Sequence, residues 1–583
     1  CASAGRSSSF GEVCCLFGRR VGLMLNAWSR AVVREEVDWA EVAAGSLLRT
    51  AVGHWRDDAD GWFAAAYERL PETARVNPLS RDFQWVESWL ESIGGEPIDW
   101  FCGVGSAWTL PFERGKAEGE VRSLLAALHE TGRLTRQEAV SMLPVLALDV
   151  QSGQTVLDMC ASPGSKTTQI AEHLGDSGVV VANEVVRGRV NMLVSNVQRH
   201  RSATVVIVNH DARHLPNVPE TGYDRILVDV PCTGTGTTRK NPDVWSRWKP
   251  NGGRSMQKLQ IDILARAAKI VKPGGRIVYS TCSLDPIENE AVVAAVMAEY
   301  PDLRLLPAAG TVPRIKASAG FTDWPILDDD CSILEGAEVR ESFAPPSDAR
   351  IVAQLPNCMR VWNDQSGGGG FFLAILEMAA DAAPKSEQNQ FETIPEADAP
   401  KDNDAAPRPL DEADTATLEA AWGRLPQNLW RRGKKILVST PEAASIWASE
   451  RNHKGSRARI PGGRWRPLRV IHLGLETAHL RRGEFERVVG AAADRLAPTI
   501  ERGVTEISAE TLDSLLSGEE PPPHEIAPDL AEVRGNHLLL DASDGTAIPV
   551  WLGGRTSLML RAQERTVLAA RRGVVIRTKD EEE

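Results

Sequence analysis

The sequence predicts an α/β fold in which a doubly wound, mostly parallel sheet is covered by helices on both faces. Five short runs rich in β-branched and aliphatic residues alternate with stretches of helical character. Strands that alternate with helices favour a parallel sheet, and uninterrupted apolar runs are typical of strands buried on both faces. Four of the five runs end in a carboxylate and the fifth ends in a cysteine. The runs are 155–158, 178–184, 204–211, 225–229 and 276–282.

Carboxylates at the strand ends predict a ligand site along one edge of this sheet. The four acids are Asp158, Glu184, Asp211 and Asp229. A carboxylate next to a core needs polar partners, and open α/β sheets bind ligands beyond the carboxyl ends of their strands. The loop after the first strand runs into a helix, whose first N–H groups and positive dipole end can bind an anionic group.

The loop after the first strand differs from known phosphate loops. Cys160 stands where GxxxxGK[ST] has its first glycine, and Lys166 follows Ser165 instead of glycine. A ligand with a carboxylate end, a ribose and an adenine fits better, with Lys166 near the amino-acid end, Glu184 on the ribose hydroxyls and Asp211 near the adenine amine. The residues expected to bind this ligand are Cys160, Ala161, Ser162, Pro163, Gly164, Ser165, Lys166, Glu184, Asp211 and Asp229.

The composition is that of an ordinary globular protein with several folding units. The length of 583 residues is enough for about three to five folding units. Of these residues, 42% are hydrophobic and 25% are charged, as is usual for globular proteins. Its net charge of −13 argues against indiscriminate binding to phosphate backbones, although local patches decide nucleic-acid binding. Nine cysteines without paired spacing support neither a disulfide framework nor a metal site, and they favour a reducing compartment. No apolar run is long enough to span a membrane.

Cys232 lies in a glycine-containing loop three residues after Asp229, at the end of the fourth run. Pro231 ends the strand, and Gly234 and Gly236 leave room for a flat substrate to approach the backbone. Two interpretations remain open from these residues alone. A free cysteine is most often a small buried hydrophobic residue, whereas a thiol beside a carboxylate at a strand end can be a nucleophile.

We expect five segments along the chain. The first thirty residues have four arginines and only one acid, which resembles a transit peptide; translation from near Met24 is the alternative. We expect a helix over 118–128, and a second helix that begins at Thr135, with Glu138 completing a capping box, and stops at Pro144. The segments are 1–49, which is not necessarily native, a small α/β cap at 50–115, the sheet domain at 116–379, a disordered linker at 380–415, and a β-rich module at 416–583.

The C-terminal module carries a basic stretch with an aromatic residue inside it. Residues 451–469 contain seven Lys or Arg residues and no acid. Basic residues around an aromatic side chain suit a surface that follows an RNA backbone and stacks on bases, although a solvated basic loop has the same composition. The candidate contacts are Arg457, Arg459, Arg464, Trp465 and Arg466.

Three blocks of the sequence resemble the RNA cytosine-5 methyltransferase family. They are DMCASPGSKT at 158–167, DVPCTGTG at 229–236 and YSTCSLDPIENE at 279–290. Blocks at 137–144, 208–211 and 238–245 are similar to signatures of the tRNA branch of that family. The resemblance covers about 50–380, and the C-terminal module looks more faintly like the PUA-like RNA-binding domain of that branch. It implies a Rossmann-like domain, an N-terminal RNA-binding cap, and S-adenosylmethionine as cofactor.

The resemblance also assigns roles to individual residues. Cys282 would add to C6 of cytosine, and Cys232 would assist loss of the C5 proton and elimination of the product. Asp229 would hydrogen-bond to the ring near N3, and Lys166 is a candidate activator of the thiolate. Arg239 and Lys240, in the block at 238–245, are candidate RNA contacts. The implied substrate is tRNA; ribosomal RNA and a non-catalytic RNA-binding role are the alternatives.

Two departures from the resembled pattern concern specificity. Asn363, Asp364 and Gln365 stand where relatives have Pro-His-His, and position 235 is threonine where many relatives of the tRNA branch have aspartate. All the groups needed for the chemistry are nevertheless present. We further expect a cytoplasmic protein, or a nuclear one in a eukaryote, that is a monomer and has neither a metal nor a membrane partner.

Overall fold

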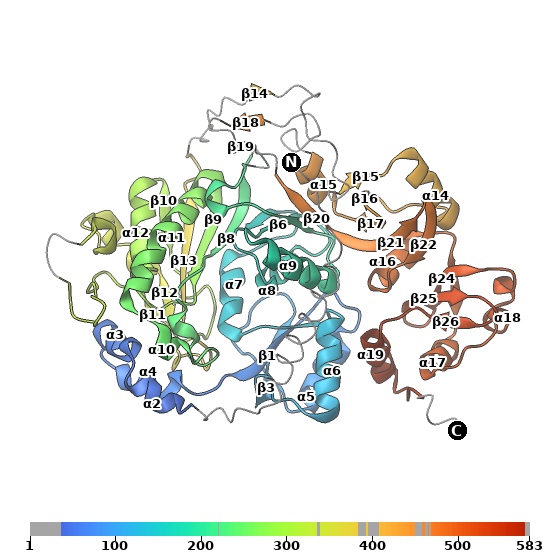
Figure 1. Cartoon of the computed structure of the whole chain (residues 1–583), viewed down its shortest axis with the longest axis horizontal. Helices are drawn as coiled ribbons and strands as arrows, with labels where there is room; N and C mark the ends of the chain where they lie inside the picture. The colour runs from blue at the N-terminus through green and yellow to red at the C-terminus, as the bar shows by residue number, and fades with distance from the viewer. Residues whose placement is uncertain are drawn as a thin grey trace, which may run out of the picture.

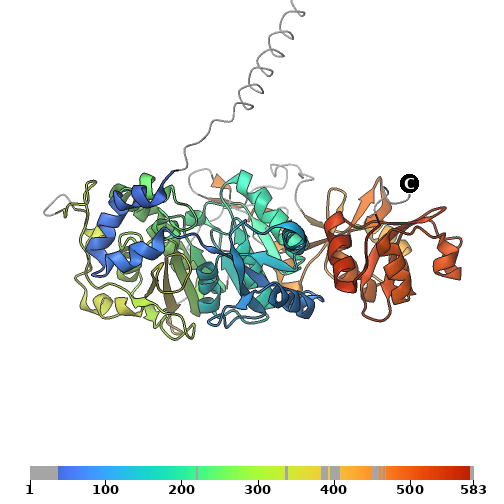
Figure 2. The same cartoon turned by 90° about the horizontal axis from the view of Figure 1, so that it is seen from below.

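A computed structural model describes residues 37–577, except for 218, 220, 335–338, 383–391, 394–406, 449–457, 461–463 and 466–467. Figure 1 shows a central sheet with helices on both sides, and Figure 2 shows the C-terminal region lying at one end of the molecule. In the part of the chain thus described, no helix is both long and apolar enough to cross a membrane.

The central sheet contains all five strands predicted from the sequence. They are β5 (Thr155–Asp158), β6 (Val179–Asn183), β7 (Val205–Val208), β8 (Tyr223–Asp229) and β9 (Val271–Thr281). They run parallel in the order β7-β6-β5-β8-β9. The order reverses direction beside β5, so the ends of β5 and β8 form the switch point at which such sheets bind ligands. The predicted α/β class is confirmed.

Antiparallel strands complete both edges of this sheet. As predicted, the run after residue 369 forms a strand: β13 (Phe371–Met378) pairs with β9. Beyond it lie β10 (Leu303–Leu306), β11 (Ser318–Ala319) and β12 (Met359–Val361). At the other edge β20 (Val470–Leu473), from the C-terminal region, pairs with β7. The C-terminal region therefore shares a sheet with the domain before it. The domain boundaries expected from the sequence assign this sheet to residues 116–379 alone.

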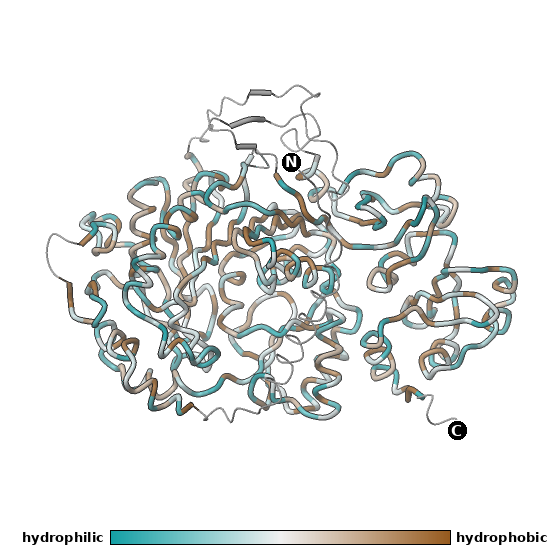
Figure 3. Tube along the Cα trace, in the orientation of Figure 1, coloured by the Kyte–Doolittle hydropathy of each residue, from teal (hydrophilic) through white to brown (hydrophobic). Residues whose placement is uncertain are grey.

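Two hydrophobic layers sandwich the central sheet, and Figure 3 shows the hydrophobic residues concentrated along its strands. One layer packs α7 (Leu143–Leu148), α8 (Ser165–Leu174) and α9 (Arg187–His200) against the sheet. The other packs α11 (Pro250–Ile270) and α12 (Glu290–Glu299). Smaller helices are α10 (Val244–Arg247) and α13 (Ala349–Val352). The site therefore stands on a buried, rigid frame.

The N-terminal cap is a four-stranded antiparallel sheet with the order β2-β3-β1-β4. Its strands are β1 (Pro71–Val76), β2 (Glu96–Pro97), β3 (Ser106–Glu113) and β4 (Leu134–Arg136); its helices are α5 (Phe83–Ser92) and α6 (Gly119–Glu130). The predicted helix over 118–128 is confirmed as α6. Helices α2 (Trp39–Ala44), α3 (Leu47–Trp55) and α4 (Ala59–Ala66) precede the cap and pack on Trp245 and Trp362.

The prediction of a helix that begins at Thr135 is wrong. Thr135 lies in β4, where it pairs with Arg75, so the tertiary pairing of β4 with β1 overrides the local capping signal. Pro144 stands in the first turn of α7 and so begins a helix instead of ending one, as proline without an N–H can do. The Glu138 carboxylate accepts instead from the N–H of Gly369, at 3.0 Å.

A fully buried ion pair joins the cap to α8. The Arg75 guanidinium, on β1, donates to both carboxylate oxygens of Glu172 at 2.5 and 3.0 Å, and both side chains are 0% exposed. His200 adds a contact to Glu172 at 2.9 Å. Burial alone would raise the pKa of Glu172, but the Arg75 charge and the His200 hydrogen bond hold it below its usual value. The pair fixes the cap against the helix that carries Lys166.

We expect Glu172→Gln to lower the free energy of unfolding by about 3 to 5 kcal/mol, because it leaves the Arg75 guanidinium buried without a counter-charge. Chemical denaturation of the two proteins measures the difference. The control is Asp262→Asn, which breaks an ion pair with the exposed Lys258 and should change stability by about 0.5 kcal/mol or less. Equal losses in the two variants would contradict the structural role of the buried pair.

Besides a small sheet of β14 (Glu392–Thr393), β18 (Ala458–Ile460) and β19 (Arg464–Trp465), two larger sheets make up the C-terminal region. The first has the order β15-β16-β17-β21-β22 and the second the order β23-β24-β25-β26. The predicted strands at 436–438, 537–540 and 547–551 and the predicted helix at 507–516 are present. The strands are β15 (Arg408–Pro409), β16 (Leu429–Arg432), β17 (Lys435–Val438), β21 (Leu475–Arg481), β22 (Glu484–Val488), β23 (Val504–Ile507), β24 (Gly535–Asp541), β25 (Ala547–Leu552) and β26 (Thr556–Leu558). The helices are α14 (Glu412–Trp422), α15 (Pro441–Ala448), α16 (Ala493–Leu496), α17 (Ala509–Ser517), α18 (Pro523–Ile526) and α19 (Ala562–Arg572).

Two local predictions in this region differ from the structure. The strand expected at 573–576 is absent from these described residues, because Gly573 ends α19 with a left-handed φ of 68°. The expected linker at 380–415 lies largely outside the described residues, although α14 already begins at Glu412. The likeness to a PUA domain stays a prediction.

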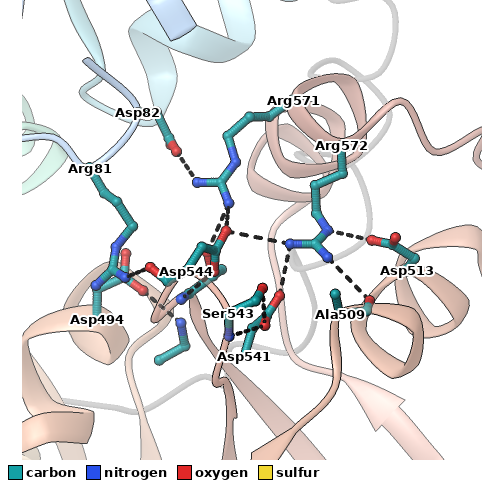
Figure 4. Close-up of polar contacts among 12 residues, drawn as sticks. Arg81, Asp82, Asp494, Ala509, Asp513, Asp541, Ser543, Asp544, Arg571 and Arg572 are labelled. Atoms are coloured by element: carbon teal, nitrogen blue, oxygen red, sulfur yellow. Dashed lines mark hydrogen bonds and ion pairs between the residues drawn. The ribbon is translucent and has the colours of Figure 1, made fainter. Parts of the chain in front are cut away.

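Helix α19 connects the C-terminal region to the cap. Val567, on α19, is 0% exposed and packs into the cap core beside α6. Glu564 pairs with Arg133 of the cap at 2.6 Å, and Arg571 pairs with Asp82 at 2.5 Å. Figure 4 shows Arg571 reaching between Asp82 and Asp544 while Arg572 contacts the acids of its own domain. These contacts fix the position of the C-terminal region beside the cap.

We expect the docking of β20 to weaken in acid. His472, on β20, is buried, and this burial lowers its pKa from 6.5 to about 4. The unfolded chain takes up this proton first as the pH falls, so the stabilisation is complete above pH 6.5 and is lost toward pH 4, by about 3 kcal/mol. Unfolding free energies measured from neutral to acidic pH test this. The slope should flatten in His472→Gln, and an unchanged slope would contradict it.

Candidate active site

A tight loop joins β5 to α8 at the switch point of the sheet. Gly164 has a φ of 113°, and a Cβ built there would lie 2.9 Å from the Leu193 side chain, so the bend needs glycine. Helix α9 holds the loop from the side: Arg189 donates to the carbonyl of Ser162 at 2.6 Å, and Asn196 to that of Pro163 at 2.7 Å. The first N–H groups of α8 lack partners within the helix. The loop can therefore offer these donors to a ligand.

Asp158 closes β5 beneath this loop. It is 1% exposed, and its carboxylate accepts from the Thr167 hydroxyl at 2.7 Å. Burial raises the pKa of Asp158 to about 7, although the Thr167 hydrogen bond opposes the shift. Its role visible in the structure is to anchor the first turn of α8.

Asp229 and Lys166 form an ion pair across the switch point. The Lys166 Nζ lies 2.8 Å from Asp229 Oδ2, and the Ser280 hydroxyl donates to Asp229 Oδ1 at 2.8 Å. Burial would lower the pKa of Lys166, but the Asp229 charge and hydrogen bond outweigh it and raise that pKa. The Asp229 carboxylate is thus fixed by contacts from α8 and β9.

The two thiols lie side by side on neighbouring parallel strands. Asp229 is paired in register with Ser280, so the loops that follow β8 and β9 carry Cys232 and Cys282 to the same place. Their Sγ atoms are 3.3 Å apart. The hydrogen bond to Cys282, followed by burial, raises the pKa of Cys232 well above its usual value. Cys232 is therefore held as a protonated thiol that can donate to the Cys282 sulfur.

A cavity of about 430 Å³ opens in front of these groups. Of the two thiols, that of Cys282 lines it, together with Lys166 and Asp229. The opposite wall comes from the cap and includes Arg136 and Gln137. A thiol, a carboxylate and a cation thus face one space between the cap and the sheet domain, large enough for a nucleotide base.

The other expected cofactor residues lie at the ends of β6 and β7. Glu184 is 3% exposed; its carboxylate accepts from the N–H of Val186 at 2.7 Å and lies 3.5 Å from Arg189. Asp211 binds Arg213 at 2.6 Å. Carboxylate acceptors at adjacent strand ends, beside the glycine-requiring turn and the N–H groups of α8, form a donor and acceptor set that fits S-adenosylmethionine. Among the described residues, no cluster of three or more potential metal ligands occurs.

The expected RNA contacts are placed unevenly. Lys240 is exposed and lines the cavity. The Arg239 guanidinium is turned inward, donating to the carbonyls of Glu68 and Gly368 at 3.1 and 3.0 Å, so its contacts are structural. Arg457 and Arg466 lie outside the described residues, as do the side chains of Arg459, Arg464 and Trp465; their role in RNA binding stays a prediction.

The residues that depart from the resembled pattern support the loop after β8. Asn363 donates to the carbonyl of Gly236 at 3.0 Å and accepts from the Trp62 indole at 2.9 Å. Asp364 pairs with Arg56 at 2.9 Å. Gln365 donates to the Ser318 hydroxyl at 3.0 Å, and the Thr235 hydroxyl accepts from the N–H of Leu284 at 2.6 Å. Asn363 and Thr235 therefore stabilise the loops around the thiols, whereas Asp364 and Gln365 tie their own segment to neighbouring ones.

One buried acid beside the thiols, Glu288, has no role that the sequence alone indicates. Glu288 contacts the segments that follow both cysteines, through Thr233 and Ser283. Its only signal in the sequence is its position in the block at 279–290. Spacing alone does not indicate its contacts.

Comparison with known proteins agrees with this geometry. Residues 145–377 match the family model described as 16S rRNA methyltransferase RsmB/F. A tRNA (cytosine(49)-C(5))-methyltransferase of Pyrococcus abyssi is 34% identical over 238 residues, which cover 41% of this chain and 74% of that protein. The chain therefore belongs to the family of RNA cytosine-5 methyltransferases.

Two longer relatives match the same part of the chain. A multisite-specific tRNA:(cytosine-C(5))-methyltransferase of Saccharomyces cerevisiae is 40% identical over 295 residues, or 47% of this chain and 43% of that protein. The ribosomal RNA small subunit methyltransferase F of Escherichia coli is 40% identical over 300 residues, or 49% of this chain and 60% of that protein. The match thus spans less than half the length of the yeast relative.

Proposed function

We propose that this chain transfers a methyl group from S-adenosylmethionine to C5 of cytosine in RNA, with tRNA as the substrate. One observation carries the proposal: the Cys282 thiol shares a cavity with the Lys166–Asp229 pair and lies 3.3 Å from a second thiol. That arrangement suits covalent catalysis on a pyrimidine, in which one thiol forms the bond and the other helps to break it.

Cys282, as a thiolate whose proton has passed to water, begins the reaction by adding its sulfur to C6 of the flipped-out base. The electron pair of the C5–C6 double bond moves toward C5, which becomes nucleophilic, while Asp229 hydrogen-bonds to the ring near N3. S-adenosylmethionine, held by the loop at 160–166 with Glu184 and Asp211, supplies an electrophilic methyl group when bound. The protein thus activates a carbon that is otherwise a poor nucleophile.

Cys232 completes the reaction. Once the Cys282 sulfur is bonded to C6, it no longer holds the Cys232 proton, and the main cause of the raised pKa of Cys232 is removed. Cys232 can then release that proton to water and take the proton from C5. The C5–H electron pair re-forms the C5–C6 double bond, the C6–S bond breaks, and Cys282 leaves as a thiolate.

A second cavity supports RNA as the substrate. It measures about 580 Å³, runs between α9 and the C-terminal region, and is lined by Arg199, which also lines the catalytic cavity. Arg487 and Arg561, both exposed, lie along it. Three carboxylates also line it, those of Glu130, Glu476 and Glu564, but each is paired with a basic side chain. A strand of RNA leaving the catalytic cavity can follow Arg487 and Arg561, although the protein as a whole is acidic.

We expect Arg487→Gln combined with Arg561→Gln to weaken RNA binding and to reduce the slope of log affinity against log salt by about 1 to 2. Binding titrations at several salt concentrations measure the slope. The control combines Arg304→Gln with Arg350→Gln; Arg304 lies on β10, at the opposite edge of the central sheet. An equal change in both double variants would argue against the path.

Labelled methyl transfer to purified RNA tests the proposed function. The chain is mixed with isotopically labelled S-adenosylmethionine and with tRNA or 16S ribosomal RNA that lacks the modification, and bisulfite sequencing locates the methylated cytosines. Methylation of tRNA supports the proposal. Methylation of ribosomal RNA alone would replace the substrate but keep the chemistry, and binding without methylation of either RNA would favour a non-catalytic role.

A further inference from the structure

A fully buried carboxylate lies directly behind the two thiols. Glu288 is 0% exposed and accepts four hydrogen bonds, which use both of its oxygens. Two come from Thr233, through its N–H at 2.9 Å and through its hydroxyl. The others come from the Ser283 hydroxyl at 2.5 Å and the Gln260 amide at 2.9 Å.

These contacts connect the segments that carry the two cysteines. Thr233 follows Cys232, and Ser283 follows Cys282, so one carboxylate holds the residue next to each thiol. Gln260 extends the link, because its amide also donates to the carbonyl of Pro231 at 3.0 Å. The peptide groups on both sides of Cys232 are therefore held by the Gln260–Glu288 pair.

Burial of this acid is unfavourable and needs a compensating reason. Moving a carboxylate out of water is costly unless hydrogen bonds replace its hydration, and burial raises the pKa of Glu288. The four hydrogen-bond donors offset the cost of burying the carboxylate. They surround Glu288 only in its position between the loops that carry Cys232 and Cys282. A hydrophobic residue there would pack as well but could not hold either loop in register.

We propose that Glu288 is a positioning residue that holds the Cys232 thiol in reach of the adduct formed by Cys282, and so sets the rate of product release. The inference rests on the proposed function, because release needs the second thiol. Glu288 itself does not touch the substrate cavity. Its loss should slow elimination more than it slows formation of the C6–S bond.

The test compares adduct accumulation in three variants. Each protein reacts with substrate RNA and S-adenosylmethionine, and the protein–RNA complex that survives denaturing electrophoresis is measured together with methylated product. Glu288→Gln replaces one carboxylate oxygen by an amide nitrogen, which can only donate to the Thr233 and Ser283 hydroxyls, so two of the four hydrogen bonds are reversed. We expect about tenfold more adduct than in the unaltered protein, with a lower rate of turnover. Cys232→Ala, which lacks the second thiol altogether, gives the largest amount of adduct that can be expected.

Glu290→Gln is the matched control. Glu290 is equally buried and is also a glutamate, but it pairs with Arg360 at 2.7 Å and accepts from the N–H of Phe321 instead of from the residues next to the two cysteines. It should lose stability without accumulating adduct. Equal accumulation in Glu290→Gln and Glu288→Gln would overturn the inference, since the effect would then be general loosening.

The adduct levels in these variants show whether the positioning role of Glu288 fails alone or together with the proposed function. Adduct in Cys232→Ala but none in Glu288→Gln overturns the positioning role and leaves the proposed function intact. No adduct in Cys232→Ala overturns the division of labour between the thiols, and the inference falls with it. If Glu288→Gln does not fold, Thr233→Val removes one of the four hydrogen bonds without a change in charge. Adduct that accumulates in Thr233→Val, to a lower level than in Cys232→Ala, supports the positioning role. An absence of adduct in Thr233→Val contradicts that role.

Discussion

Methyl transfer is expected to fall by about a thousandfold or more when Cys282 is replaced by alanine. Without the sulfur, no bond forms to C6, and C5 of cytosine stays a poor nucleophile. Cys232 lies 3.3 Å away but does not line the cavity, and its thiol is held protonated. It is therefore a poor substitute. Single-turnover methyl transfer to RNA measures the loss.

Two controls separate lost chemistry from lost structure. Cys102 is an exposed cysteine, and Cys102→Ala should keep full activity. RNA affinity of Cys282→Ala should stay within about twofold of the unaltered protein, because one thiol in the cavity contributes little to binding a long backbone. Methyl transfer that survives in Cys282→Ala would show that another group is the nucleophile.

Replacement of Cys232 by alanine is expected to have the opposite effect on the covalent intermediate: the C6–S bond to Cys282 forms but does not break. Cys282 can still add to C6 and the methyl group can still be transferred, but the base that removes the C5 proton is missing. The protein–RNA adduct should accumulate to nearly one equivalent, while steady-state turnover falls by about a hundredfold or more. Denaturing electrophoresis with labelled RNA measures the adduct.

The double variant Cys232→Ala with Cys282→Ala is the control for this trap. It should show no adduct, because the sulfur that forms the bond is absent. Persistent adduct in the double variant would place the covalent bond on another residue. Free turnover in Cys232→Ala would show that water or another side chain removes the proton.

The central fold could be predicted because its strands carry their own signal. Runs such as 205–208 are apolar throughout, as is typical of strands buried on both faces. Thr135 was misassigned because a capping pattern is local, whereas its pairing with Arg75 depends on a strand sixty residues earlier. The pairing of β20 with β7 joins residues more than 250 positions apart, and neither strand alone indicates it.

The site was predictable where chemistry and position coincide. Cys282, Cys232, Asp229 and Lys166 were expected to meet, and the structure brings them together. Arg239 turned inward because backbone carbonyls from two other segments converge on it, which composition does not reveal. Glu288 was missed for the same reason: its four donors come from three separate segments.

The covalent bond itself offers the most direct test of the central claim. RNA that carries 5-fluorocytosine at the target position should trap the unaltered protein, because fluorine at C5 cannot leave as a proton does. Digestion and mass spectrometry then identify the residue bonded to the base. We expect the bonded residue to be Cys282. A bond to Cys232, or methylation of the fluorinated RNA without any bond, would contradict it.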